Sequence, residues 1–345
     1  MLPRMSQMEF VFVRACTYTN THEHMTNGNH EDELDIRVML LSRHERSIMN
    51  IDEFRTVVKE YLLENYEEYE VTEHDATKNN NLILHGLCIK KKNEKIAPTI
   101  YLENYLKDYN IGISMEVIAR NIVDTAENAQ LKGEIDVDFF MSYEKIKDHI
   151  YIKLVNKEAN TEMLKELPHK EFLDLAMIVY CDVSKICGIC ASVTVKNDFI
   201  RRWEVSEEEI ISQAYSNTKN AGATIWDMRT LIKGRFNEDK LSEAQLIDAG
   251  SIFVMGNEAM TFGAIAMTFD DVLDEFINNS CKGVYIIPSS IHEVILIRDK
   301  EDGECSVLND MVKQVNSECL EKEDILADHA YYYSPDNGYS IVEDK

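Results

Sequence analysis

The residues best suited to chemistry gather in one short stretch, Pro288-Ser289-Ser290-Ile291-His292-Glu293-Val294. A serine nucleophile needs a histidine base, and the histidine needs a carboxylate to orient it. Asp328, next to His329, is the distant carboxylate that could complete such a set. Ser289 or Ser290 with His292 and Asp328 would then form a hydrolase-like site, although no Gly-x-Ser-x-Gly elbow accompanies it.

The same stretch has a structural interpretation. Polar residues in turns commonly hydrogen-bond to the turn backbone, so both serines could close the turn while His292 or Glu293 ties strands together. His292-Glu293 also begins the zinc-protease pattern His-Glu-x-x-His, but position 296 is Leu. Residues 291–297 are rich in β-branched side chains and predict a strand, on which neighbours point to opposite faces. The zinc-protease interpretation is therefore excluded.

Other candidate motifs are incomplete. Cys187-Gly-Ile-Cys190 has neither the second pair that zinc requires nor a helix start, which a thioredoxin-like site requires. A metal could bind only adventitiously at His22, His24, His30 and Asp32, which lie in a polar segment. Ser142-Tyr-Glu-Lys145 matches Ser-x-x-Lys without its partner motifs. Neither Gly-x-Gly-x-x-Gly nor a Walker A loop is present, so we expect no metal and no cofactor.

Composition narrows the class of protein. The chain has 345 residues, with 62 acidic and 36 basic side chains and a net charge of −26. Clustered Lys and Arg, which a phosphate-binding surface requires, are missing, so we expect no nucleic-acid partner. No stretch approaches the ~20 apolar residues of a membrane span. Eight cysteines without a dense framework fit reduced thiols, and we expect a cytoplasmic protein.

The elements that must position these residues indicate an α+β fold. Residues 1–50 are polar and weakly patterned, and we expect a peripheral or partly disordered extension. Residues 51–167 predict an α+β region that begins with a helix capped by Asn50 and Glu53. Its strands run from Val71 and from Leu82 to Ile89, and a helical region covers about 137–167. Pro168 marks the boundary between the two halves.

Residues 168–345 repeat one order of elements, strand-strand-helix, which predicts hairpins in a mostly antiparallel sheet with helices on one face. The strands in these units are expected at the ranges 172–180, 188–195, 252–255, 262–267, 284–287 and 292–297. A last hairpin, residues 330–333 and 339–342, turns at Pro335-Asp336-Asn337-Gly338. Residues 219–248 interrupt the series as a helical insertion around Trp226.

Several stretches resemble an uncharacterised family of gut anaerobic bacteria whose members are known only as a domain of unknown function. The matching residues are Pro98-Thr-Ile-Tyr-Leu-Glu103, Pro168-His169, Phe172-Leu-Asp-Leu-Ala176, Asn217-Thr218, Pro288 to Val294 and Leu326-Ala-Asp-His-Ala-Tyr331. The resemblance covers about 50–343 and implies no activity. Where the family often has a proline after Asn217-Thr218, this chain has Lys219, so the expected turn there would differ in shape.

None of the candidate sets of catalytic residues is complete, and the clearest sequence patterns are those of apolar residues that pack a core. We therefore expect a non-enzymatic intracellular binding or regulatory module with a protein partner. Glu293, His329 and Trp226 are the candidate binding residues. The alternative is the hydrolase-like enzyme that uses Ser289 or Ser290, His292 and Asp328.

Overall fold

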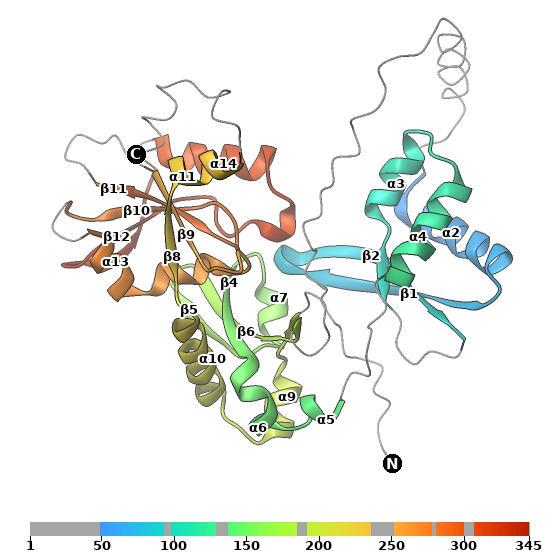
Figure 1. Cartoon of the computed structure of the whole chain (residues 1–345), viewed down its shortest axis with the longest axis horizontal. Helices are drawn as coiled ribbons and strands as arrows, with labels where there is room; N and C mark the ends of the chain where they lie inside the picture. Colours follow the sequence, from blue (N-terminus) through green and yellow to red (C-terminus); the bar gives the residue numbers. More distant parts are fainter. Residues whose placement is uncertain are drawn as a thin grey trace, which may run out of the picture. The chain divides into compact units, whose positions relative to one another are not determined.

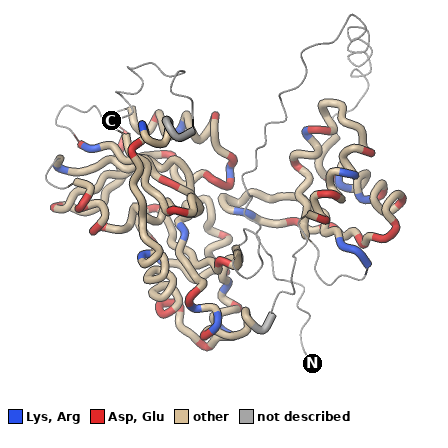
Figure 2. The backbone as a smooth tube through the Cα atoms, viewed as in Figure 1, with Lys and Arg blue, Asp and Glu red and all other residues tan. Residues whose placement is uncertain are grey.

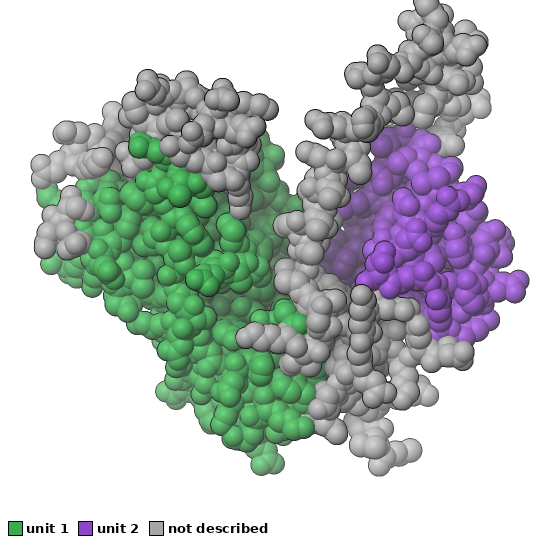
Figure 3. All heavy atoms as spheres, in the orientation of Figure 1, with its two compact units in different colours: residues 1–13, 79–82, 135–345 green, residues 14–78, 83–134 purple. Residues whose placement is uncertain are grey.

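The computed structural model describes residues 49–92, 98–128, 137–184, 192–235, 252–277, 281–299 and 307–344. These residues form two compact units (Figure 3). Unit 1 holds the described residues of 79–82 and 135–345, and unit 2 those of 14–78 and 83–134. The division falls between residues 134 and 135, whereas the sequence placed the boundary near Pro168. Apart from Met49 and Asn50, the expected extension lies outside the described residues.

Unit 2 is a three-stranded antiparallel sheet with helices packed on it (Figure 1). Its sheet has the order β1-β2-β3. Its elements are α2 (Ile51–Asn65), β1 (Tyr69–Lys78), β2 (Leu82–Lys91), β3 (Thr99–Tyr101), α3 (Glu103–Asn110) and α4 (Met115–Asn128). The short helix η1 (Asn79–Asn81), between β1 and β2, belongs to unit 1.

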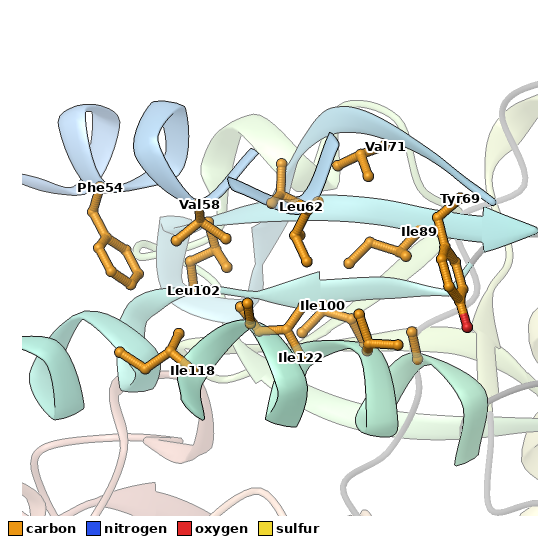
Figure 4. Close-up of a cluster of buried hydrophobic side chains, with 14 residues drawn as sticks. Phe54, Val58, Leu62, Tyr69, Val71, Ile89, Ile100, Leu102, Ile118 and Ile122 are labelled. Atoms are coloured by element: carbon orange, nitrogen blue, oxygen red, sulfur yellow. The ribbon is translucent and has the colours of Figure 1, made fainter. Parts of the chain in front are cut away.

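The first helix of unit 2 begins as the sequence predicts. Asn50 Oδ1 accepts the Glu53 N–H at 3.0 Å, and Glu53 Oε2 accepts the Asn50 N–H at 3.2 Å. This reciprocal pair satisfies two backbone donors that a helix start leaves open. Phe54, Val58 and Leu62 then recur every four residues and point into the core (Figure 4). The predicted capping box and apolar face are confirmed.

Unit 1 contains two antiparallel sheets and the helices around them. The strands are β4 (Ile150–Asn156), β5 (His169–Phe172), β6 (Leu175–Asp182), β7 (Ser192–Thr194), β8 (Thr224–Asp227), β9 (Ile252–Gly256), β10 (Val284–Pro288), β11 (Val294–Arg298), β12 (Tyr331–Ser334) and β13 (Gly338–Ile341). The α-helices are α5 (Val137–Phe140), α6 (Tyr143–Ile146), α7 (Thr161–Leu164), α9 (Asn197–Trp203), α10 (Glu207–Ala221), α11 (Met228–Arg235), α13 (Asp270–Ile277) and α14 (Leu308–Glu318). Short 3₁₀ helices are η2 (Lys147–His149), η4 (Gly263–Thr268) and η6 (Lys322–Asp324).

The four-stranded sheet has the order β4-β6-β5, with β7 also paired to β6, and β4 forms one edge. Helix α10 covers this edge with two side chains from its last turns. The Thr218 hydroxyl accepts the Ile152 N–H at 2.8 Å, and the Asn217 amide donates to the Ile150 carbonyl at 2.8 Å. An edge strand whose backbone groups are occupied in this way cannot pair with another chain there. The expected turn after Asn217-Thr218 is wrong, because α10 continues to Ala221.

The six-stranded sheet has the order β13-β12-β10-β11-β9-β8, and β8 and β13 are its edges. Tyr285, Ile287, Ile295 and Ile297 pack with Leu308 and Val312 of α14 on one face. On the other face, Phe253 and Arg298 contact Phe276 of α13. The antiparallel α+β fold predicted from the sequence is confirmed. The sequence placed helices on one face of the sheet, but α13 adds cover to the second.

Three local predictions differ from the structure. Residues 150–156, expected in a helical region, form β4, because their alternating apolar residues pair with all of β6 from Leu175 to Cys181. Residues 262–267, expected as a strand, fall mainly in the buried 3₁₀ helix η4 (Gly263–Thr268), whose small residues fit a crowded interior. Residues 224–227, within the expected helical insertion, form β8, and residues 236–248 of that insertion lie outside the described residues.

The described residues carry their charges on many elements of both units. Figure 2 shows acidic and basic positions interspersed along helices and strands. None of the helices in the described ranges combines the length and apolar character needed to cross a membrane.

Candidate functional site

The turn between β10 and β11 carries the serines singled out from the sequence. Ser290, which is buried, donates its backbone N–H to the Glu293 carbonyl at 3.2 Å. Its Oγ accepts the His292 backbone N–H at 3.0 Å. Ser289 Oγ donates to Glu293 Oε1 at 3.3 Å. Both hydroxyls therefore bond within the turn, as polar turn residues commonly do.

His292 is held by a backbone donor on one side and a carboxylate on the other. Its Nδ1 accepts the Phe262 N–H at 3.1 Å, and its Nε2 lies 3.3 Å from Asp324 Oδ1. The ring stacks on the Phe262 ring, with centroids 5.5 Å apart and planes 17° apart. Because Nδ1 accepts a hydrogen bond, the proton of a neutral ring lies on Nε2, where it can be donated to Asp324.

The structure brings only part of the predicted hydrolase set together. The carboxylate beside the His292 ring belongs to Asp324 of η6. Asp328 lies beside the other histidine instead, with its Oδ1 2.9 Å from Nδ1 of His329. Ser290 meets His292 through the backbone N–H rather than the ring. Asp324 could not be predicted from the sequence, because no motif or hydrophobic pattern surrounds it. Its position is fixed by the Asp324 carbonyl, which accepts the Ile291 N–H at 2.9 Å.

A second polar cluster surrounds His329. Its Nδ1 lies 2.9 Å from Asp328 Oδ1, and its Nε2 forms an ion pair with Asp174 Oδ2 at 3.3 Å. The Tyr331 hydroxyl donates to the other oxygen of Asp174 at 2.9 Å. Asp174 lies in the turn between β5 and β6, which the sequence read as one continuous strand. That turn depends on Leu173, whose φ of 53° is left-handed.

The charges of this second cluster reinforce one another. The Asp174 carboxylate raises the pKa of His329 more than burial lowers it, and Asp328 adds to the rise. Burial raises the pKa of Asp174, but hydrogen bonding from His329 and Tyr331 outweighs burial, so that pKa is lowered. The arrangement favours an imidazolium between two carboxylates. Asp174 and Asp328 approach opposite nitrogens of the ring, so they do not converge on one point.

Trp226 and Glu293, two predicted binding residues, come together at the end of β9. A methyl group on Gly256 would lie 3.6 Å from Trp226 Cζ3 and 3.6 Å from Glu293 Cβ. Both side chains therefore lie within van der Waals reach of the position that a Cβ atom at residue 256 would take. Both are half-buried. We call the group of Trp226, Gly256 and Glu293 the tryptophan corner; the third predicted binding residue, His329, belongs to the second cluster.

The segment 322–331, which supplies Asp324, Asp328 and His329, is held largely by asparagine side chains. Its carbonyl groups accept hydrogen bonds from four amides: Asn80 to Lys322 and Ile325, Asn79 to Glu323, Asn156 to Leu326 and Asn316 to Ala327. Asn80 itself is buried and exchanges hydrogen bonds with the fully buried Asn160. Asn80 and Asn160 use both the oxygen and the nitrogen of their amides, and buried amides satisfied in this way favour one backbone path.

Two hollows lie in unit 2, whereas the two histidine clusters and the tryptophan corner belong to unit 1. Across the described ranges, no group of three or more His, Cys, Asp or Glu side chains could hold a metal ion. Cys187, Cys190, His22, His24, His30 and Asp32 lie outside the described residues. The two hollows are open and have volumes of about 630 and 350 Å³. The smaller includes His85 and Glu103, whose Oε1 accepts the His85 N–H at 2.6 Å.

The structure is that of an α+β protein with antiparallel sheets. A family model described as a family of unknown function, DUF5688, matches residues 51–335, and the chain belongs to that family. The family resemblance inferred from the sequence is confirmed to that extent. Comparison with curated proteins and with solved structures finds no match.

Proposed function

We propose that this chain is a non-enzymatic module that binds a protein partner through the tryptophan corner. The single observation that carries the proposal is that half-buried Trp226, on the edge strand β8, and half-buried Glu293, just before β11, both lie around Gly256. Tryptophan is enriched among the residues that dominate binding energies, because its large ring combines apolar area with a polar N–H.

The polar groups of the β10–β11 turn support a structural rather than a catalytic role. A general base must accept the nucleophile's proton at a free ring nitrogen. His292 Nδ1 already accepts the Phe262 N–H, and Nε2 faces Asp324. Ser289 and Ser290 are engaged with Glu293 and with the turn backbone. These contacts support a rigid frame beneath the tryptophan corner.

The cysteines support a reducing compartment such as the cytoplasm. Cys88 and Cys319 are free thiols. Disulfides form and persist in oxidising compartments, so free thiols fit a reducing one. Treating intact cells with a membrane-impermeant thiol reagent should leave Cys319, the exposed thiol, unlabelled until the cells are lysed.

Native mass spectrometry of the protein gently purified from its own host tests the binding proposal. The wild-type chain should carry a partner at defined stoichiometry, and Trp226→Ala and Glu293→Gln should each lose it. Met311→Ala and Glu275→Gln are matched controls, because they remove an exposed apolar side chain and an exposed carboxylate elsewhere in unit 1. A partner that stays bound to both the Trp226→Ala and the Glu293→Gln variant would contradict the proposal.

The hydrolase-like enzyme is a second candidate, favoured by one observation, the 3.3 Å separation of His292 Nε2 and Asp324. In this arrangement Asp324 would orient the ring in place of Asp328. Turnover of p-nitrophenyl acetate that is lost in Ser289→Ala and in His292→Asn, with both variants folded, would support this candidate. Equal background rates in all three proteins would remove it.

A further inference from the structure

We infer that the partner pairs with β8 as an added antiparallel strand and places a Lys or Arg side chain at the tryptophan corner. This inference rests on the proposed function and deepens it, because it names how the partner binds and what chemistry it presents. An extended segment that extends a sheet gains main-chain hydrogen bonds, and the side chains beside the edge select its sequence.

The first support is the contrast between two edges of unit 1. The β4 edge is closed by Asn217 and Thr218, which occupy the carbonyl of Ile150 and the N–H of Ile152. Strand β8 pairs with β9 through Thr224 to Asp227 and, in the part of the chain that the structure describes, has a strand on that side only. Unprotected edges are templates for pairing with another chain.

The second support is the chemistry beside the β8 edge. Trp226 belongs to β8 itself, and Glu293 immediately precedes β11, two strands away. A Cβ atom at position 256 would lie 3.6 Å from Trp226 Cζ3 and 3.6 Å from Glu293 Cβ, so both side chains lie around the same glycine. An aromatic ring and a carboxylate both suit a cation, because the ring quadrupole and the negative charge attract it. A Lys or Arg side chain that crosses β8 would meet both groups.

The third support is the net charge of the whole chain. It distinguishes between two possible binders of the β8 edge, a second copy of this chain and a basic segment of another protein. A second copy of this chain could pair β8 with β8, but each copy carries a net charge of −26. Like charges of that size oppose self-association, whereas they attract a basic segment and accelerate its encounter. The basic partner is therefore the occupant that the charges favour.

Selection from a phage-displayed library of random twelve-residue peptides against the immobilised full chain tests this inference. Enriched peptides should combine β-branched or aromatic residues with a central Lys or Arg and contain no internal proline. Binding of a synthetic enriched peptide should weaken roughly tenfold in Trp226→Ala and in Glu293→Gln. Trp226→Phe, which keeps a ring face, should retain most of the affinity, and Glu275→Gln all of it.

Hydrogen exchange of the full chain with and without the peptide reports the mode of binding. The backbone amides of Thr224 to Asp227 should exchange more slowly when the peptide is bound. Acidic peptides, failure to enrich any sequence, or equal binding to the wild type and both corner variants would overturn the inference. A concentration-dependent dimer of the free chain that protects the same amides would overturn it in favour of a second copy.

The outcomes separate this inference from the proposed function beneath it. Peptide binding that depends on Trp226 and Glu293 without protection of β8 would retain the binding corner and reject strand addition. Protection of β8 by peptides that bind both variants normally would retain strand addition and reject the corner. A host partner lost from both corner variants, together with a library that yields nothing, would leave the proposed function standing alone.

Discussion

His292 and His329 are two half-buried histidines of unit 1 that both lie 3.3 Å from an aspartate, yet their surroundings give them different roles. His292 is 26% exposed, accepts a backbone N–H and faces one carboxylate, Asp324. His329 is 18% exposed and lies between two carboxylates, Asp174 and Asp328. The first arrangement suits a neutral ring that bridges loops, and the second suits a cation. The partners of a histidine, rather than its burial, decide what it contributes.

The largest expected effect is the loss of Asp174. Asp174→Ala should destabilise the protein by about 3 kcal/mol, because it leaves the buried Tyr331 hydroxyl without its acceptor and removes one of the two carboxylates beside His329. Asp324→Ala, the matched change beside His292, should cost only about 1 kcal/mol, because, among the described residues, the Asp324 side chain has a polar contact with the His292 ring alone, and that ring keeps its bond with the Phe262 N–H. Urea unfolding of both variants measures the difference. Equal costs would erase the distinction between the two histidines.

A smaller effect is expected at His292. His292→Ala should cost about 2 kcal/mol, since the Phe262 N–H loses its acceptor and the stacked ring is removed. His292→Asn should cost about half as much, because the amide oxygen can replace Nδ1 as acceptor. Thermal unfolding of the two variants tests this order. If His292→Asn is no more stable than His292→Ala, the stacked ring and not the Nδ1 acceptor provides the stabilisation.

The pH dependence of stability should follow the second cluster. The raised pKa of His329 means that its stabilisation is complete below about pH 6.5 and is lost as pH rises through the folded-state pKa. The lowered pKa of Asp174 means that its stabilisation is present above about pH 4 and is lost as pH falls through the folded-state pKa. The pair therefore contributes most between those limits.

Urea unfolding of the wild type and His329→Gln at pH 5.5 and at pH 9 measures this contribution. The stability difference between the two proteins should be larger at the lower pH. A difference that does not change with pH would show that His329 contributes by packing alone. The same pair of measurements on His292→Asn supplies the comparison.

The smallest effects are expected at the two serines. Ser290→Ala should cost about 1 kcal/mol, because the part-buried His292 N–H loses its acceptor. Ser289→Ala should cost less than about 0.5 kcal/mol, because its hydroxyl contacts a half-buried carboxylate that water can also reach. Chemical unfolding of both variants checks the order. A larger loss of stability in Ser289→Ala than in Ser290→Ala would show that Ser289 is the more important residue for the structure of the turn.

Local patterns predicted much of the fold. The capping box at Asn50 and Glu53 and the hairpins β10–β11 and β12–β13 follow from caps, alternation and turn residues close in sequence. Strand β4 was missed because its role depends on β6, and η4 because burial on all sides overrides the strand pattern of Phe262 to Met267. Local sequence patterns predict contacts between residues that are close in the sequence, and they do not predict how distant segments pair or pack.

The polar partners could not be predicted for a related reason. Asp324 reaches His292 across 32 positions, and Asp174 reaches Tyr331 across 157. No spacing rule connects residues that far apart. The sequence therefore identified His292 and His329 as notable but supplied a carboxylate, Asp328, that contacts only the second.

The asparagine contacts of the segment 322–331 have a consequence for the order of events during synthesis. Asn80 donates to the carbonyls of Lys322 and Ile325, which are 242 and 245 positions later in the chain. Asn80 and its buried partner Asn160 therefore emerge from the ribosome long before the carbonyl groups that complete their hydrogen bonding. Contacts of such long range form late and slowly. Unit 1 can finish folding only when its last tenth has been made.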